Sequence, residues 1–256
     1  MTSTSRTKFI TVVVASALML TLAACGGQQS VTNTDNKESA SSSSAPANKN
    51  TSKVKSIEEI TKEVDKETQD ALASMQSDFA TLSGKINSYD AFVADTAELQ
   101  AFYDKVIAYT TSLGVVLRER AVDYANAVLN SKKDSSEQYD DIDELFDRIY
   151  DDAGDDIYDG TYEGVLDDAY KTFYDGVIQD GYDLNDYAQW SDVSSQEYER
   201  WSDARSDVYE VWSDFRSDIY EFYSDIKGEF FDKDTERAQE KIENFQKEIE
   251  SLKSQG

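Results

Sequence analysis

The sequence predicts an all-α protein, an elongated bundle of about four to five long helices that pack in a coiled-coil-like manner. The first observation is a single Pro in 256 residues, because proline interrupts helices. The second is that apolar side chains recur at spacings of three and four residues through much of the chain after residue 56. The third is an eleven-residue repeat in the C-terminal region, a period close to three whole helical turns. No alternation of strands and helices is visible, which argues against an α/β solute-binding fold.

The first helix is expected over residues 57–87. Ser56 and Glu59 have the spacing of a capping box, in which two side chains and two backbone N–H groups pair at a helix N-terminus. Thr68 takes one position on the apolar face of this helix. The other positions of that face are Ile57, Ile60, Val64, Ala71, Met75, Phe79, Leu82 and Ile86. Residues 87–90 then favour a turn.

The second helix is expected over residues 91–131. It is richer in Ala and aliphatic side chains than any later segment, which makes it the best candidate for the centre of the core. Gly114 lies inside it, where glycine costs about 1 kcal/mol relative to Ala. A close contact between helices would explain that glycine.

A twelve-residue repeat of tyrosines covers residues 150–185. Its tyrosines alternate at spacings of eight and four, and they are Tyr150, Tyr158, Tyr162, Tyr170, Tyr174 and Tyr182. Twelve residues exceed three α-helical turns by about 1.2 residues, so on one straight helix these rings would spiral around the axis. The glycines of this segment offer places where such a helix could be interrupted. We therefore expect two helices, over about residues 136–158 and 162–181, joined near Gly160.

From residue 190 to 233 the repeat has eleven residues. Trp190, Trp201, Trp212 and Tyr223 open four successive blocks, and each continues with Ser-Asp. Each position of such a repeat forms a stripe along a nearly straight helix. We expect one continuous helix whose tryptophan stripe is buried against the helix at 91–131 or against a second copy of the chain. The alternative is that the same stripe is an exposed docking surface.

Two charged features accompany this repeat. Arg205, Arg216 and Lys227 share one position, with a ring four residues before and four after each cation, which suits either cation–π stacking or an ion pair with a neighbouring helix. The opposite face is acidic. Its members are Asp203, Asp207, Glu210, Asp214, Asp218, Glu221, Asp225, Glu229 and Asp232. This face is either solvated or a docking surface for a basic partner. A last amphipathic helix follows from about 235 to 253.

The N-terminal region carries a short apolar core, Phe9 to Leu22, preceded by Arg6 and Lys8. Its fourteen residues are too few for a membrane-spanning helix, which needs about 20. The residues that follow it are Leu22, Ala23, Ala24, Cys25 and Gly26. This motif resembles the lipobox of bacterial lipoproteins.

The resemblance implies that residues 1–24 are a lipoprotein signal peptide and that Cys25 is acylated and becomes the mature N-terminus. It also implies the extracytoplasmic face of a cell membrane, and we favour a Gram-positive type surface over an outer membrane. Residues 25–55 then form a Ser/Thr/Asn-rich tether, which buries too little apolar surface to fold. Residues 56–256 form a single acidic helical domain.

Several classes of chemistry lack their residues. The chain has no His, and its single Cys is assigned to the anchor, so the sequence offers no Cys/His zinc site, imidazole base or thiol nucleophile. No phosphate-binding glycine loop or nucleophile elbow occurs either. We therefore expect neither enzymatic activity nor a cofactor.

A calcium-binding loop is the one metal site that the acids suggest. An EF-hand loop that starts at Asp155 places Asp159 fifth and Gly160 sixth, as that motif requires. However, Ile157 then takes the third position and Leu166 the twelfth, where oxygen ligands are needed. We predict no dedicated metal site, and weak, diffuse binding of divalent cations stays open.

The net charge limits the partners. Loss of residues 1–24 removes Arg6 and Lys8, so the formal charge goes from −27 to −29. Such a charge repels nucleic acid and anionic lipid headgroups. We expect attachment to the membrane through Cys25 and an interaction with another envelope protein or a second copy. The expected function is therefore that of a scaffold in the cell envelope. The alternatives are a surface adhesin and the capture of cations or cationic peptides.

Overall fold

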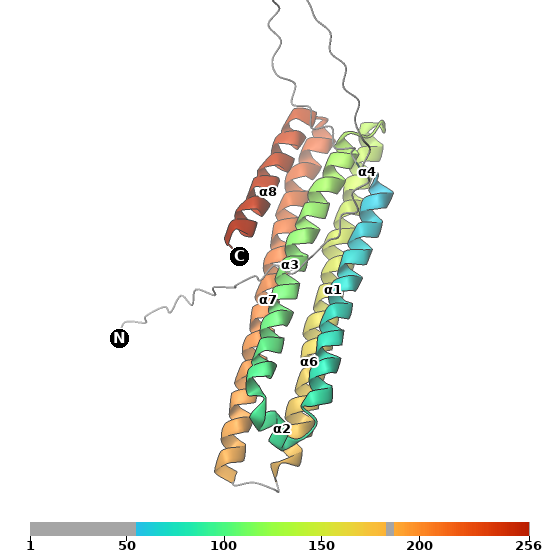
Figure 1. The fold of residues 1–256 in the computed structure, drawn as a ribbon. Coiled ribbons are helices and arrows are strands. Elements are labelled where there is room, and N and C mark those ends of the chain that lie inside the picture. Colours follow the sequence, from blue (N-terminus) through green and yellow to red (C-terminus); the bar gives the residue numbers. More distant parts are fainter. Residues whose placement is uncertain (1–54, 183–186, 256) are drawn as a thin grey trace, which may run out of the picture.

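The computed structural model describes residues 55–182 and 187–255, and within them it is helical, with no strand. Long helices run side by side along one direction (Figure 1). The predicted all-α bundle is therefore confirmed. Within the same two ranges no helix combines the length and hydropathy of a membrane span. The predicted signal peptide, the lipobox with Cys25, and the tether to residue 54 lie outside the described residues.

The first two long helices are α1 (Ile57–Lys85) and α3 (Thr96–Leu129), and the short helix α2 (Tyr89–Ala94) lies at the end of the bundle where they meet (Figure 1). The capping box of Ser56 and Glu59 is present as predicted. The predicted single helix over 91–131 is wrong at its start, because Asp95 separates α2 from α3. The separate helix α2 places Tyr89 and Phe92 in the core at the bundle end.

From Tyr150 to Tyr174, the tyrosine repeat lies on one uninterrupted run of helical turns, and Tyr182 follows a turn at Gly181. In order, the elements of this run are α4 (Ser135–Phe146), η1 (Asp147–Ala153), α5 (Gly154–Ile157), η2 (Tyr158–Val165), α6 (Leu166–Ala169) and η3 (Tyr170–Ile178), where η marks π-helix. The backbone at each junction keeps right-handed helical angles. The predicted division into two helices near Gly160 is therefore wrong.

The π segments explain why no break is needed. Successive α segments start at Gly154 and Leu166, twelve residues apart, so one π segment falls in each repeat. Three α-helical turns take about 10.8 residues, and a π-bulge accommodates roughly one more within the same number of turns. Twelve residues thus complete three turns, and the tyrosines stay on one side of the segment.

Glycines in this segment serve close contacts. A Cβ on Gly160 would lie 2.5 Å from a methyl carbon of Leu72 in α1, and one on Gly181 would overlap the ring of Tyr89. A Cβ on Gly114 of α3 would lie 3.2 Å from Nη1 of Arg118 in the same helix and at an ordinary contact distance, 3.9 Å, from the Cβ of Phe215. Gly160 and Gly181 therefore allow close contacts with α1 and α2, whereas we expected the glycines of the tyrosine repeat to interrupt its helices.

The eleven-residue repeat forms one continuous helix, α7 (Tyr187–Asp232), as predicted. The chain then reverses at Lys233, whose φ of 61° is left-handed, and enters α8 (Thr235–Gln255). α8 packs against both α3 and α7. The helix that carries the repeat thus ends just before Lys233, and Gly228 lies inside α7.

Two hydrophobic clusters fill the bundle, one toward each end. The N-terminal half of α3 contributes Leu99, Phe102 and Val106 to one cluster, and its C-terminal half contributes Leu117 and Val128 to the other. As predicted, α3 lies at the centre of the core.

α7 faces this core with the fourth and eighth positions of its repeat. The buried apolar residues at these two positions are Ala204, Val208, Phe215, Ile219, Ile226 and Phe230. By contrast, Trp190, Trp201, Trp212 and Tyr223 are only half-buried. The predicted burial of the tryptophan stripe against the helix at 91–131 is therefore wrong, because smaller aliphatic and Phe side chains fill the contact with α3.

Candidate functional site

The tryptophan stripe packs on the segment that contains the π-helices. The indole Nε1 atoms of Trp190, Trp201 and Trp212 donate hydrogen bonds to backbone carbonyl oxygens. The acceptors and distances are Ile178 at 2.8 Å, Leu166 at 3.0 Å and Gly154 at 2.9 Å. Each acceptor lies where a π segment ends, and a carbonyl has two lone pairs, so it can accept an indole besides a backbone N–H. Indole donors spaced eleven residues apart in α7 thus meet carbonyl acceptors spaced twelve residues apart in the facing segment.

The rings repeat in the same way. Each ring of the stripe contacts one aromatic ring of the facing segment. The pairs and their centroid distances are Trp190–Tyr182 at 4.9 Å, Trp201–Tyr170 at 4.4 Å, Trp212–Tyr158 at 4.8 Å and Tyr223–Phe146 at 4.2 Å. Aromatic pairs at such distances stabilise by about 0.5–1.5 kcal/mol beyond their buried area. The stripe therefore holds α7 to the tyrosine repeat.

Cations lie between successive rings. The guanidinium carbon of Arg216 is 3.9 Å from the ring centroid of Tyr150 and 5.2 Å from that of Trp212, and its Nη1 is 2.8 Å from Asp155. Eleven residues earlier, Arg205 repeats the arrangement over Tyr162 and Trp201, with Asp167 at 3.3 Å. Lys227 repeats it again with Tyr139, Tyr223 and Asp143. Both predicted modes, cation–π contact and an ion pair with a neighbouring helix, occur together.

A second set of rings on α7 is exposed. The ninth position of the repeat and its extension to residue 187 leave rings 48–72% exposed at intervals of eleven residues. These rings are Tyr187, Tyr198, Tyr209, Tyr220 and Phe231, and we call them the aromatic face. At 1.5 Å per residue, the 44 steps from Tyr187 to Phe231 extend over about 66 Å. Aromatic side chains are enriched at protein–protein interfaces, so this row of exposed rings is a candidate interaction site.

Acidic side chains border the aromatic face. Each of its last four rings is followed by an exposed acid, namely Glu199, Glu210, Glu221 and Asp232. Elsewhere on α7 the predicted acidic face receives cations from other helices. Asp218 accepts a hydrogen bond of 2.9 Å from the buried Arg118 of α3, and Asp225 lies 2.8 Å from Lys241 of α8. The acids nearest the exposed rings therefore form the more available negative surface.

Sequence analysis missed a buried polar cluster. Glu197 is fully buried and accepts hydrogen bonds from Tyr103 Oη at 2.7 Å and Arg200 Nε at 3.1 Å. Burial raises the pKa of Glu197 and also that of Tyr103. The available signal was its place in the repeat, since Glu197 occupies the eighth position, where Val208 and Ile219 are apolar. The cluster joins α3 to α7 inside the core.

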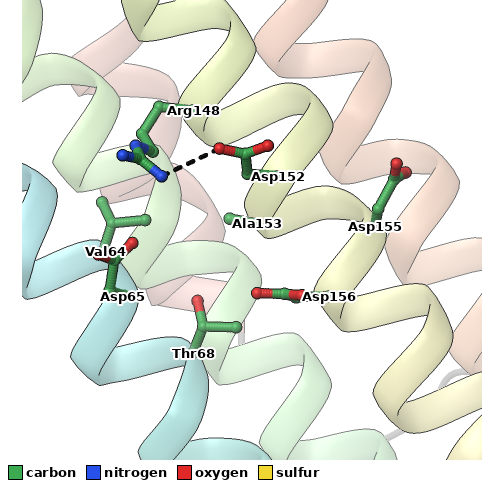
Figure 2. Close-up of a pocket in the computed structure, with 8 residues that line it drawn as sticks. All are labelled: Val64, Asp65, Thr68, Arg148, Asp152, Ala153, Asp155 and Asp156. Carbon is green, nitrogen blue, oxygen red and sulfur yellow. Dashed lines mark hydrogen bonds and ion pairs between the residues drawn. The ribbon is translucent and has the colours of Figure 1, made fainter.

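An acidic cavity of about 350 Å³ opens between α1 and the η1–α5 segment (Figure 2). Its lining residues are Val64, Asp65, Thr68, Arg148, Asp152, Ala153, Asp155 and Asp156. Thr68 is 1% exposed, and its Oγ1 has no hydrogen-bond partner. In Figure 2 this hydroxyl points into the space between Arg148 and Asp156. Sequence analysis placed Thr68 on the apolar face of its helix, which gave no indication of the cavity.

The carboxylates of the acidic cavity differ in their partners. Arg148 Nη1 lies 3.0 Å from Asp152, and Arg216 reaches Asp155 from α7. Asp65 and Asp156 pair with no cation among residues 55–182 and 187–255. Burial raises the pKa of Asp156, and the charges of nearby aspartates, Asp65 among them, raise it further. Across the described residues, no group of three or more acidic side chains could hold a metal ion directly.

No protein-family model matches the chain, and no match is found among curated proteins or solved structures. The functional argument therefore depends on the aromatic face and the acidic cavity. The predicted lipidation site Cys25 and its neighbours Leu22, Ala23, Ala24 and Gly26 are outside the described residues.

Proposed function

We propose that this protein is a lipid-anchored interaction protein on the outer side of a cell membrane, without enzymatic activity of its own. Its aromatic face would dock a basic segment of another protein in the envelope. The observation that carries the proposal is the row of five rings, 48–72% exposed, along α7. The resemblance of residues 22–26 to a lipobox supports the location. A Ser/Thr/Asn-rich tether of the predicted length would let the bundle stand clear of the bilayer, since a chain of about 30 residues reaches roughly 100 Å when extended.

Charge and chemistry favour a basic occupant. The chain has a net charge of −27, which makes a second copy an unfavourable partner. The exposed rings alternate with acids, and rings beside carboxylates are good surroundings for Lys and Arg side chains. The protein uses this mode internally, since Arg205 and Arg216 each lie over two rings and beside an aspartate. An extended Lys/Arg-rich segment could repeat the same contacts along the aromatic face.

Site-specific crosslinking in cells tests the proposal. A photoreactive phenylalanine replaces Tyr209 or Tyr220 in the full chain, and the matched control carries it at Ser112, an exposed position of α3. We expect both aromatic-face positions to crosslink to a lysine- or arginine-rich segment that the control does not capture. Crosslinking to an acidic or neutral segment, or to a second copy of the chain, would refute the proposal of a basic partner. A host-cell or neighbouring-cell partner would favour the adhesin alternative.

A binding measurement separates docking from diffuse capture of cationic peptides. A synthetic extended lysine-rich peptide is titrated into the protein and into Tyr209→Ser/Tyr220→Ser. We expect about tenfold weaker binding by the double variant, because each ring contributes a cation–π contact. Equal affinities that fall together with added salt would instead indicate capture by the overall negative charge. In the same cells, an alkyne fatty acid should label the protein, and Cys25→Ala should abolish the label.

A further inference from the structure

Thr68 differs from other threonines in the helices around it. Thr61 and Thr110 donate their hydroxyl hydrogens to the carbonyl oxygen four residues earlier, at 3.1 and 2.9 Å. The hydroxyl of Thr68 makes no such bond, although the residue is only 1% exposed. A buried hydroxyl without a partner is unfavourable. Its orientation into the acidic cavity therefore indicates a ligand with hydrogen-bonding groups (Figure 2).

The charges around that hydroxyl define the class of ligand. Four aspartates and one arginine line the acidic cavity, so its walls carry an excess of negative charge. Two of the carboxylates, Asp65 and Asp156, pair with no cation in the part of the chain that the structure describes. Asp156 is exposed, and its pKa is raised by partial desolvation and by this crowding of like charges. A bound cation would offset the repulsion between these carboxylates.

We propose that the acidic cavity binds a primary ammonium group, held by Thr68 Oγ1 and the carboxylates of Asp65 and Asp156. An ammonium group has three N–H donors and no acceptor, which matches three oxygen acceptors from three side chains. The alkyl chain of the ligand lies toward Val64 and Ala153, the two apolar residues of the lining.

Other cations fit the acidic cavity less well. Calcium requires six to eight oxygen ligands at short range, and the described residues bring no three acidic groups into a metal-binding arrangement. A guanidinium presents five donors in a planar fork, and Arg148 already places one at the edge of the cavity against Asp152.

Calorimetric titration of the full chain tests this inference independently of the aromatic face. The probes are putrescine and Nα-acetyl-lysine methylamide, and the control cation is tetramethylammonium, which has the same unit charge as the lysine probe but no N–H donor. We expect at least one ammonium probe to bind about tenfold or more tightly than tetramethylammonium. Binding of putrescine alone assigns the site to a small polyamine, and binding of the lysine analogue alone assigns it to a protein side chain. Equal affinity for tetramethylammonium, or no binding of either ammonium probe, overturns the proposal.

Variants locate the binding. Thr68→Val keeps the shape of the side chain and removes the hydroxyl, and Asp156→Asn keeps the shape and removes the charge. Each should weaken ammonium binding by about tenfold, whereas Thr68→Ser should retain it. Asp180→Asn, which removes an exposed acid at the far end of the same helical segment, is the matched control and should bind like the parent. If Thr68→Val does not fold, the exposed Asp156→Asn decides, and unchanged binding by it refutes the site.

Discussion

The segment from α4 to η3 and the helix α7 have repeats of different lengths, yet they match along their whole contact. α7 repeats every eleven residues and stays α-helical, whereas its partner repeats every twelve residues and contains a π segment in each repeat. Both complete three turns per repeat, so indole donors and carbonyl acceptors meet three times in succession. The comparison teaches that the number of turns in a repeat, rather than its number of residues, determines which side chains face each other.

The largest expected effect comes from single-residue deletions in the two segments. Deleting Ser206 from α7 rotates every later residue by about 100°, which turns Phe215 and Ile226 away from the core. We expect this variant to lose cooperative thermal unfolding, as measured by circular dichroism. Deleting Asp159 from η2 should instead convert a π segment to α-helix and lower the melting temperature by less than about 10 °C. If both deletions unfold the protein, the π segment does not absorb the extra residue.

A smaller effect should separate the two stripes of α7. Phe215 is fully buried against α3, and Phe215→Ala should cost about 3–5 kcal/mol in the free energy of unfolding. Trp212 is half-buried, so Trp212→Ala should cost roughly half as much. Trp212→Phe, which removes the bond to Gly154 and keeps a ring, should cost about 1 kcal/mol.

Ser213→Ala is the control for this series, and it should change the free energy of unfolding by less than about 0.5 kcal/mol. Urea unfolding curves for the four variants and the parent provide the values. If Trp212→Ala costs more than Phe215→Ala, the contact with the tyrosine repeat stabilises α7 more than the core does.

The smallest effect concerns the glycines. Gly181→Ala should lower the free energy of unfolding by about 1–3 kcal/mol, because the new Cβ would overlap the buried ring of Tyr89. Gly228→Ala in α7 should raise it by about 1 kcal/mol, since no atom lies within 4 Å of the new Cβ and Ala is the better helix former. Thermal melting of both variants measures the difference. Stabilisation by Gly181→Ala would show that this glycine serves no close contact.

Much of the fold follows from local patterns in the sequence. The capping box at Ser56, the aliphatic face of the second helix and the eleven-residue period of α7 depend on contacts within one helix or on its spacing, so they are visible in the sequence. The cation position shared by Arg205, Arg216 and Lys227 was visible for the same reason. Their aspartate partners were not, because these belong to another segment and are matched through a repeat of different length.

The candidate sites depended more on tertiary structure. The aromatic face consists of residues that the repeat had already placed on one stripe, but only packing decided that these rings stay exposed while the rings of the tryptophan stripe are half-buried. The acidic cavity combines Thr68 with Asp156, which lie 88 positions apart in the sequence, and no local period relates them.

By itself, the sequence determined the helical class, the period of each repeat and the residues that share a helix face, because a helix has a constant rotation per residue. The tertiary structure alone decided which face meets which neighbour and where the twelve-residue segment adopts π turns. The physical reason is that α7 presents donors and rings every three turns, and its partner gains these contacts only by accommodating the extra residue in a wider turn.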